Sequence, residues 1–285
     1  MTLERATRSG RGAGPGPAFE AGGVERVRPY QEVLVPGIFG PWAERLVAAL
    51  APEPGARALD VGTGPGTVAR VLAAAVGPGG AVVGTDPSPA MLTLAREDPA
   101  PVPSAPVQSA SVQYVECGAA PLHVSDEAFD LVTAQQVLQF VPDRRAALAE
   151  MRRAARPGAR IAVVTWLPLA RNPLFRALRD AVAAVLGPEQ AELFEEPWSL
   201  AGEEVAALVE AAGFTEVERH EWTVPVTLPG GPDALCSLFG FSAVAPYVAA
   251  HREALHRAVR EGLAGHTDGR GLHGDTAASV VMARA

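Results

Sequence analysis

The sequence predicts an α/β fold, a doubly wound and mostly parallel sheet flanked by helices. Two observations lead to this prediction. Short apolar strands alternate with amphipathic helices between about residues 41 and 166, the rhythm of repeated βα units. The stretch 160–166 is an almost continuous apolar run, as expected of a strand that helices cover on both faces. With 48% apolar residues among 285, the chain can also bury a sizeable core.

Turn and capping residues set the expected bounds of the first elements. Pro41 and Pro89 stand at first helical positions, where the missing N–H costs nothing, and Gly77 follows a helix as a stop. Ser88 can cap the helix that follows the second strand. These signals predict helices at 41–50, 67–76 and from Pro89, and strands at 57–61 and 81–85, the second ending in Asp86.

Further along, the alternation continues to residue 166 and then changes character. A Pro-, Ala- and Ser-rich stretch at 99–110 is expected to be a surface insertion. We expect a disordered leader at 1–25 and a single domain at 26–285, with cap insertions at about 167–200 and 228–265. The remaining expected elements are strands at 111–115, 129–134, 160–166, 215–227 and 278–283, and helices at 143–156, 172–186, 203–212 and, for the most part, 233–263.

Charge and cysteine content exclude several classes of protein. The formal net charge is −8, which disfavours nucleic-acid binding because that affinity comes largely from neutralised phosphates. The two cysteines form no CxxC pair and no Cys/His cluster at metal-ligand spacing, so we expect no metal site and no disulfide framework. Neither a secretory signal nor an apolar run of membrane-spanning length is evident. A cytoplasmic protein is expected.

The strongest chemical signal is the segment 59–66, Leu-Asp-Val-Gly-Thr-Gly-Pro-Gly, between a predicted strand and helix. Glycines at such a bend let the backbone turn tightly and approach a ligand without a Cβ clash. Twenty residues after Gly66 the second strand ends in Asp86, whose carboxylate can accept hydrogen bonds from both hydroxyls of a ribose. Two consecutive βα units thus present one site shaped for a nucleoside.

Two kinds of nucleoside cofactor match this outline. A dinucleotide site requires G-x-G-x-x-G so that the helix N-terminus can hold a pyrophosphate, whereas this chain has G-x-G-x-G followed by Thr67. Asp60 adds a negative charge beside the loop, which would repel a pyrophosphate but attract a sulfonium ligand with an amino group. The residues favour S-adenosyl-L-methionine, and an NAD(P)-dependent oxidoreductase remains the alternative.

With these residues the chain resembles the class I S-adenosylmethionine-dependent methyltransferases, especially the bacterial group that includes the ubiquinone/menaquinone C-methyltransferases. The motifs that carry the resemblance are 59–66, 84–91, 128–132, 135–143 and 156–158. It implies a Rossmann-like sheet with an antiparallel last strand and helical lid insertions. It also implies that the cofactor lies against Asp60, Gly62, Thr63, Gly64, Gly66, Asp86, Pro87, Met91, Gly118, Ala119, Ala134 and Gln135. Tyr30 is a further candidate, and Met91 is equally compatible with a place in the core.

Two departures from the family pattern affect the expected chemistry. Cys117-Gly118-Ala119 stands where the family often has Gly-Asp-Ala, so the usual carboxylate contact to the adenine is missing. Gln139 and Phe140 occupy the place where many relatives have a histidine, which is the general base in some O-methyltransferases. No catalytic residue is therefore assigned. Phenols, amines and stabilised enols need no base at that place, and a fold that binds the cofactor without transferring methyl remains an alternative.

The acceptor is expected to be small and largely apolar, and a secondary metabolite fits the Ala/Gly/Pro/Arg-rich composition. The two insertions contain several aromatic residues that we expect to form a lid over an apolar acceptor pocket. They are Phe175, Phe194, Trp198, Phe239, Phe241 and Tyr247. Simple packing of the insertions on the core explains any one of these rings equally well.

Overall fold

The computed structural model describes residues 23–97 and 109–285. The leader expected at 1–25 and the insertion expected at 99–110 lie almost wholly outside the described residues. Val24 and Glu25, the last residues of the expected leader, already belong to helix α2 (Val24–Pro29).

An eight-stranded sheet runs through the molecule in the order β3-β2-β1-β4-β5-β8-β6, with β7 paired to β8 alone. Strands β1 to β5 are mutually parallel, and β8 is antiparallel to both of its long neighbours. The predicted doubly wound sheet and the antiparallel last strand are therefore confirmed. The strands are β1 (Arg57–Val61), β2 (Ala81–Asp86), β3 (Ser111–Glu116), β4 (Phe129–Gln135), β5 (Ala155–Trp166), β6 (Thr215–Leu228), β7 (Thr267–Asp268) and β8 (Gly271–Arg284).

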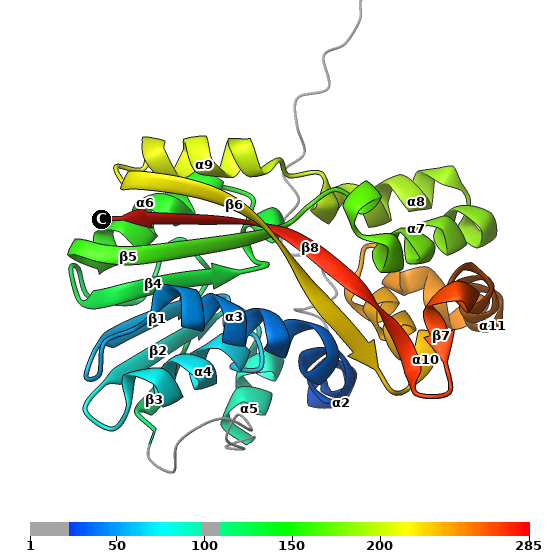
Figure 1. The fold of residues 1–285 in the computed structure, drawn as a ribbon, viewed down its shortest axis with the longest axis horizontal. Coiled ribbons are helices and arrows are strands. Elements are labelled where there is room, and N and C mark those ends of the chain that lie inside the picture. Colours follow the sequence, from blue (N-terminus) through cyan, green and yellow to red (C-terminus); the bar gives the residue numbers. More distant parts are fainter. Residues whose placement is uncertain (1–22, 98–108) are drawn as a thin grey trace, which may run out of the picture.

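Helices cover both faces of the sheet and enclose two apolar cores (Figure 1). On one face, Leu46, Leu72 and Leu94 are buried in the core that also extends into the cap. On the other face, Leu148 and Val209 belong to a separate core. The helices on the sheet are α3 (Gly40–Leu50), α4 (Thr67–Val76) and α5 (Pro89–Glu97) for the first face, and α6 (Arg144–Ala154) and α9 (Gly202–Ala211) for the second.

A cap of helices lies beyond one end of the sheet (Figure 1). Both expected insertions are largely helical: 167–200 and 228–265 supply almost all of the cap. Strands β6 and β8 extend past the sheet as a two-stranded ribbon that reaches these helices, because their pairing continues to Leu228 and Leu272. The cap elements are η3 (Leu169–Arg171), α7 (Pro173–Leu186), α8 (Pro188–Glu195), η4 (Glu196–Trp198), α10 (Gly231–Leu235), η5 (Cys236–Phe241), α11 (Ala245–Gly262) and η6 (Ala264–His266).

Three element bounds differ from the sequence prediction for physical reasons. The last strand begins at Gly271 rather than at residue 278, because β6 supplies hydrogen-bond partners for a glycine-rich stretch with no apolar alternation. Strand β5 begins at Ala155, which pairs with Phe129, so helix α6 ends earlier than expected. The helix expected at 41–50 is the last part of a helical run that starts at Val24.

This amino-terminal run passes through α2, the π-helix η1 (Tyr30–Phe39) and α3 without a break. Pro29 and Pro36 lie inside it, and proline normally ends a helix. The wider π-helical turns remove the usual i to i−4 bonding in this stretch. By length and composition alone the run 24–50 is also apolar enough to cross a membrane, but half of its most apolar window is buried inside the fold.

Candidate active site

The glycine bend between β1 and α4 has the backbone that its residues predict. Gly62, Gly64 and Gly66 all have positive φ angles, of 67°, 54° and 83°. A Cβ at Gly62 or Gly66 would collide with a neighbouring side chain, whereas a Cβ at Gly64 would meet nothing within 4 Å. Gly62 and Gly66 thus allow neighbouring side chains to pack closely against the bend, and Gly64 faces open space.

Asp86 ties this bend to the end of the neighbouring strand β2. Its Oδ2 accepts a hydrogen bond from the Gly64 N–H at 2.8 Å, and its Oδ1 accepts one from the Ser88 N–H at 2.9 Å. The carboxylate is only 9% exposed. Burial raises its pKa to about 6, although the two N–H groups act in the opposite direction. The glycine bend and Asp86 are therefore in direct contact. Each carboxylate oxygen of Asp86 also keeps a lone pair that can accept a hydrogen bond from another donor.

A second buried carboxylate, Asp60, lies beneath the bend in β1 and is 1% exposed. Its Oδ1 accepts a hydrogen bond from Thr133 Oγ1 at 2.8 Å. Burial raises its pKa to about 6, the hydroxyls of Thr63 and Thr133 lower it, and the nearby charge of Asp86 raises it. Two acids at one strand-end edge make the site complementary to a cation and unfavourable for a pyrophosphate.

The amino-terminal run closes over the same edge of the sheet. Tyr30 lies near enough to Asp86 for that carboxylate to raise the pKa of the phenol, after the larger effect of burial. Its ring stacks on Phe39 at 4.8 Å and meets Phe241 edge-on at 5.3 Å. Gln135, at the end of β4, donates from Nε2 to the Phe39 carbonyl at 3.2 Å. The sequence suggested a covering segment after Tyr30, but it did not predict that this segment is helical, because Pro36 and Gly37 hide the helical pattern.

The other predicted cofactor contacts lie at the expected strand ends, with different degrees of exposure. Thr63 is buried within the bend. Pro87 is exposed, and Gly118 and Ala119 are half-buried after β3. Ala134 is buried in the second core at the end of β4. Met91 is buried in the first core, which is one of the two positions that the sequence analysis considered for it.

Several buried amide atoms at the end of β4 and just after it have no hydrogen-bond partner among the residues that the structure describes. They are the Oε1 of Gln135 and the whole side-chain amides of Gln136 and Gln139. Gln139 is 3% exposed, and Gln136 adopts a φ of 50°. An unpaired buried amide destabilises a fold, so these groups indicate a place where a bound molecule supplies partners. One sequence feature pointed to this place: Gln139 stands where many relatives have a histidine.

A chain of ring contacts connects this edge of the sheet with the cap. Trp166, at the end of β5, lies 6.2 Å from Phe39 and 5.0 Å from Phe175. From Phe175 the contacts continue through Trp198 and Phe194 to Phe239, with centroids 5.3 to 5.9 Å apart. Five of the six aromatic residues that we expected in a lid belong to this buried core, and Tyr247 is 44% exposed.

The histidines give no candidate base at the strand ends. His123, in the loop after β3, and His251, on α11, are both exposed. His220 is exposed on β6 and interacts with Glu218.

Residues 59–163 match a family described as a methyltransferase domain. Nocamycin O-methyltransferase from Saccharothrix syringae is 37% identical over 196 residues, which cover 64% of this chain and 68% of that protein. A 2-phytyl-1,4-naphtoquinone methyltransferase from Synechococcus elongatus is 31% identical over 195 residues, 65% of this chain and 82% of that protein. An uncharacterized protein from Mycobacterium tuberculosis is 33% identical, and the match spans 66% of its length.

Solved structures show the same fold at lower identity. The YcgJ protein from Bacillus subtilis aligns with a TM-score of 0.55 at 17% identity, over 85% of this chain and 97% of that one. The fold, the glycine bend with its acid and the sequence relatives agree. This chain belongs to the class I S-adenosylmethionine-dependent methyltransferases, the family that it resembles by motif, and S-adenosyl-L-methionine is the cofactor of that family.

The residues at the strand ends fit that cofactor. Two buried carboxylates complement its positive charges, and the open space above Gly64 admits a ligand next to the backbone. The unpartnered Oε1 of Gln135 offers a hydrogen-bond acceptor at the same edge. Gly118 is also open, since a Cβ there would meet no atom closer than 3.9 Å. The assignment of individual contacts stays a prediction.

Proposed function

We propose that this chain transfers the methyl group of S-adenosyl-L-methionine to a small, largely apolar acceptor held between the strand ends and the cap. The observation that carries the proposal is the pair of buried carboxylates, Asp60 and Asp86, at the glycine bend. A nicotinamide dinucleotide would bring a pyrophosphate to the same helix N-terminus, where the charge of Asp60 beside the bend opposes it. The oxidoreductase alternative is therefore disfavoured.

The cofactor, when bound, supplies an activated methyl group that an acceptor atom attacks in line. The chain's own residues bind the cofactor and orient the two reactants. Asp86 accepts hydrogen bonds from a ribose, and Asp60 offers negative charge beneath the bend. Helices α2 and η1 exclude water from the edge of the sheet, and alignment of the two reactants without water accounts for much of the rate in such reactions.

The aromatic rings of the cap support an apolar acceptor. Phe175, Trp198 and Phe239 are at most 8% exposed and pack within one cluster of rings, so the surface that they would offer to an acceptor is apolar, and an apolar molecule would replace ring contacts with contacts of the same kind. Two of the relatives are named as methyltransferases of nocamycin and of a naphthoquinone. These names support a small-molecule acceptor here. A role in secondary metabolism and a cytoplasmic location stay predictions.

Two measurements test the proposal. Isothermal titration should show S-adenosylhomocysteine binding at micromolar concentration or below and no binding of NADH. Tritium-labelled S-adenosyl-L-methionine should then pass label to a panel of phenols, amines and β-dicarbonyl compounds, recovered in the organic phase. Binding of NADH instead would support the oxidoreductase. Cofactor binding without transfer to any compound in the panel would favour a protein that binds the cofactor without using it.

A further inference from the structure

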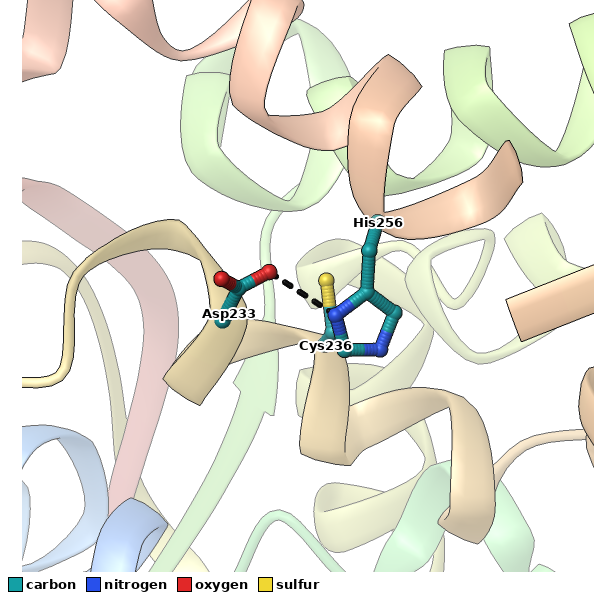
Figure 2. Close-up of side chains that lie close together, drawn as sticks. All are labelled: Asp233, Cys236 and His256. Carbon is teal, nitrogen blue, oxygen red and sulfur yellow. Dashed lines mark hydrogen bonds and ion pairs between the residues drawn. The ribbon is translucent and has the colours of Figure 1, made fainter. Parts of the chain in front are cut away.

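Three side chains of different chemistry, from three neighbouring elements of the cap, lie close together (Figure 2). Asp233 lies on α10, Cys236 lies one helical turn later at the start of η5, and His256 lies on α11. One carboxylate oxygen, the Sγ and a ring nitrogen all lie within 4.8 Å of one another. Sulfur, imidazole and carboxylate together are the donor set that zinc-class ions take in proteins.

Cys236 occupies the inner side of this cluster. It is 4% exposed, and Figure 2 shows its sulfur beside the hydrogen bond that joins Asp233 and His256. Burial raises the pKa of the thiol to about 12, so the thiol is protonated at neutral pH. Its Sγ lies within 4.8 Å of a carboxylate oxygen of Asp233 and a ring nitrogen of His256, so the buried thiol faces these two groups.

His256 and Asp233 already share one contact that an ion could replace. The Nδ1 of His256 lies 2.8 Å from Oδ1 of Asp233. Arg260 Nη1 donates to both oxygens of Asp233, at 2.8 and 2.9 Å. A metal ion that takes the place of the shared proton leaves the Arg260 contact to Oδ2 intact. The positive charge of Arg260 opposes a cation, but the two negative ligands, thiolate and carboxylate, exceed it.

We propose that Asp233, Cys236 and His256 bind one divalent ion of the zinc class, with water as a fourth ligand. Binding releases the thiol proton to solvent, and the proton on Nδ1 of His256 is replaced by one that Nε2 takes up from solvent, so that a neutral imidazole is the ligand. New bonds form from Sγ, Nδ1 and Oδ1 to the ion. Typical zinc bond lengths are about 2.3 Å to sulfur and about 2.1 Å to nitrogen or oxygen, so the thiol has to move inward by a small side-chain rotation. His256 is 23% exposed and gives the ion a path from solvent.

The position of this site links it to the aromatic cap. Segment η5 continues from Cys236 to Phe239 and Phe241, whose rings contact Phe194 and Tyr30. A bound ion would join η5 to α11 and so fix the segment that carries these rings. The sequence alone offered no such site because His256 lies twenty residues after Cys236, outside any common ligand spacing.

The test uses the full-length, untagged protein after treatment with a chelator. Titration with Co²⁺ should produce an ultraviolet sulfur-to-cobalt charge-transfer band and the strong visible bands of tetrahedral cobalt, saturating at one equivalent. Zn²⁺ should abolish both bands and raise the melting temperature. Cys236→Ala should lose the charge-transfer band, and His256→Gln should weaken cobalt binding at least tenfold. The matched control is Cys117→Ala, which removes the other buried cysteine and should leave the spectrum unchanged.

Arg260→Gln distinguishes a metal site from a purely structural ion pair. Removal of the opposing charge should tighten cobalt binding several-fold, even where the variant melts earlier. Absence of a charge-transfer band in the folded wild type, or an unchanged band in Cys236→Ala, would overturn the proposal. Circular dichroism confirms that each variant is folded. Since every readout is metal binding or stability, failure of this test leaves the methyltransferase proposal untouched.

Discussion

The cofactor edge of the sheet and the helical cap are held together by different forces. At the cofactor edge, backbone N–H groups bond a carboxylate, and the two acids are buried with raised pKa values. In the cap, rings such as Phe175 and Trp198 pack on one another. The first region keeps a buried charge that destabilises it until a cation binds, whereas the second gains its stability directly from burial. The cap residues therefore act mainly on stability, whereas the two acids act on binding and on stability in opposite senses.

The largest effect that we expect is a loss of stability when the packing of the cap alone is disrupted. Phe175 is 1% exposed and contacts Trp166 and Trp198, so Phe175→Ala should lower the free energy of unfolding by roughly 3–5 kcal/mol. Urea denaturation measures this change. S-adenosylhomocysteine affinity of the folded variant should change only a few-fold. Tyr247→Ala, an exposed aromatic of the cap, is the control and should stay within about 0.5 kcal/mol. A loss below about 1 kcal/mol for Phe175→Ala would contradict this account.

The next effect is a loss of cofactor affinity when a residue of the cofactor edge alone is changed. Asp86→Asn replaces one acceptor oxygen by a donor and removes the charge that a ribose and a cation would meet. We expect S-adenosylhomocysteine affinity to fall about 100-fold, or roughly 3 kcal/mol, by isothermal titration. Asp130→Asn is the matched control, because this acid lies on the same sheet and bonds Arg57 and Arg156. Equal losses in both variants would show that Asp86 acts only on stability.

A pH series should move binding and stability in opposite directions. The folded, ligand-free protein holds its two buried acids at pKa values of about 6, above the 3.8 of an aspartate in an unfolded chain. The folded state therefore binds more protons than the unfolded state between these values, and the free energy of unfolding falls as pH rises from about 4 to 6. Affinity for S-adenosylhomocysteine should instead rise, about fivefold per carboxylate between pH 5 and 6, because an acid with a pKa of about 6 goes from about a tenth to about a half ionised over this range. Asp60→Asn should flatten the stability profile, and a wild-type affinity that does not change over this range would refute the assignment.

The smallest effect concerns the buried amide at the boundary of the two regions. Gln139→Leu removes a buried amide that has no partner in the described structure, so the free energy of unfolding should increase by about 1 kcal/mol. Gln113→Leu, on exposed β3, should change it by less. A clear loss of stability in Gln139→Leu would mean that the amide has a partner within the fold, and that it does not await a ligand.

The sequence by itself determined the sheet, the glycine bend and the acid at the end of β2. These features depend on short-range rules: glycine at positive φ, apolar alternation, and the fixed place of a strand end beside the next helix. Residues 57–97 therefore follow the predicted order of elements closely. The antiparallel last strand also followed, through the resemblance to the family.

Tertiary structure alone decided the features that depend on distant partners. The run 24–39 is helical although it contains Pro29 and Pro36, because its apolar side chains pack on the strand ends and the cap. The ribbon of β6 and β8 is long because each strand satisfies the other's backbone. Asp233 and His256 meet because α10 and α11 pack together. No local pattern encodes these contacts, since each depends on burial and hydrogen bonds made across long stretches of chain.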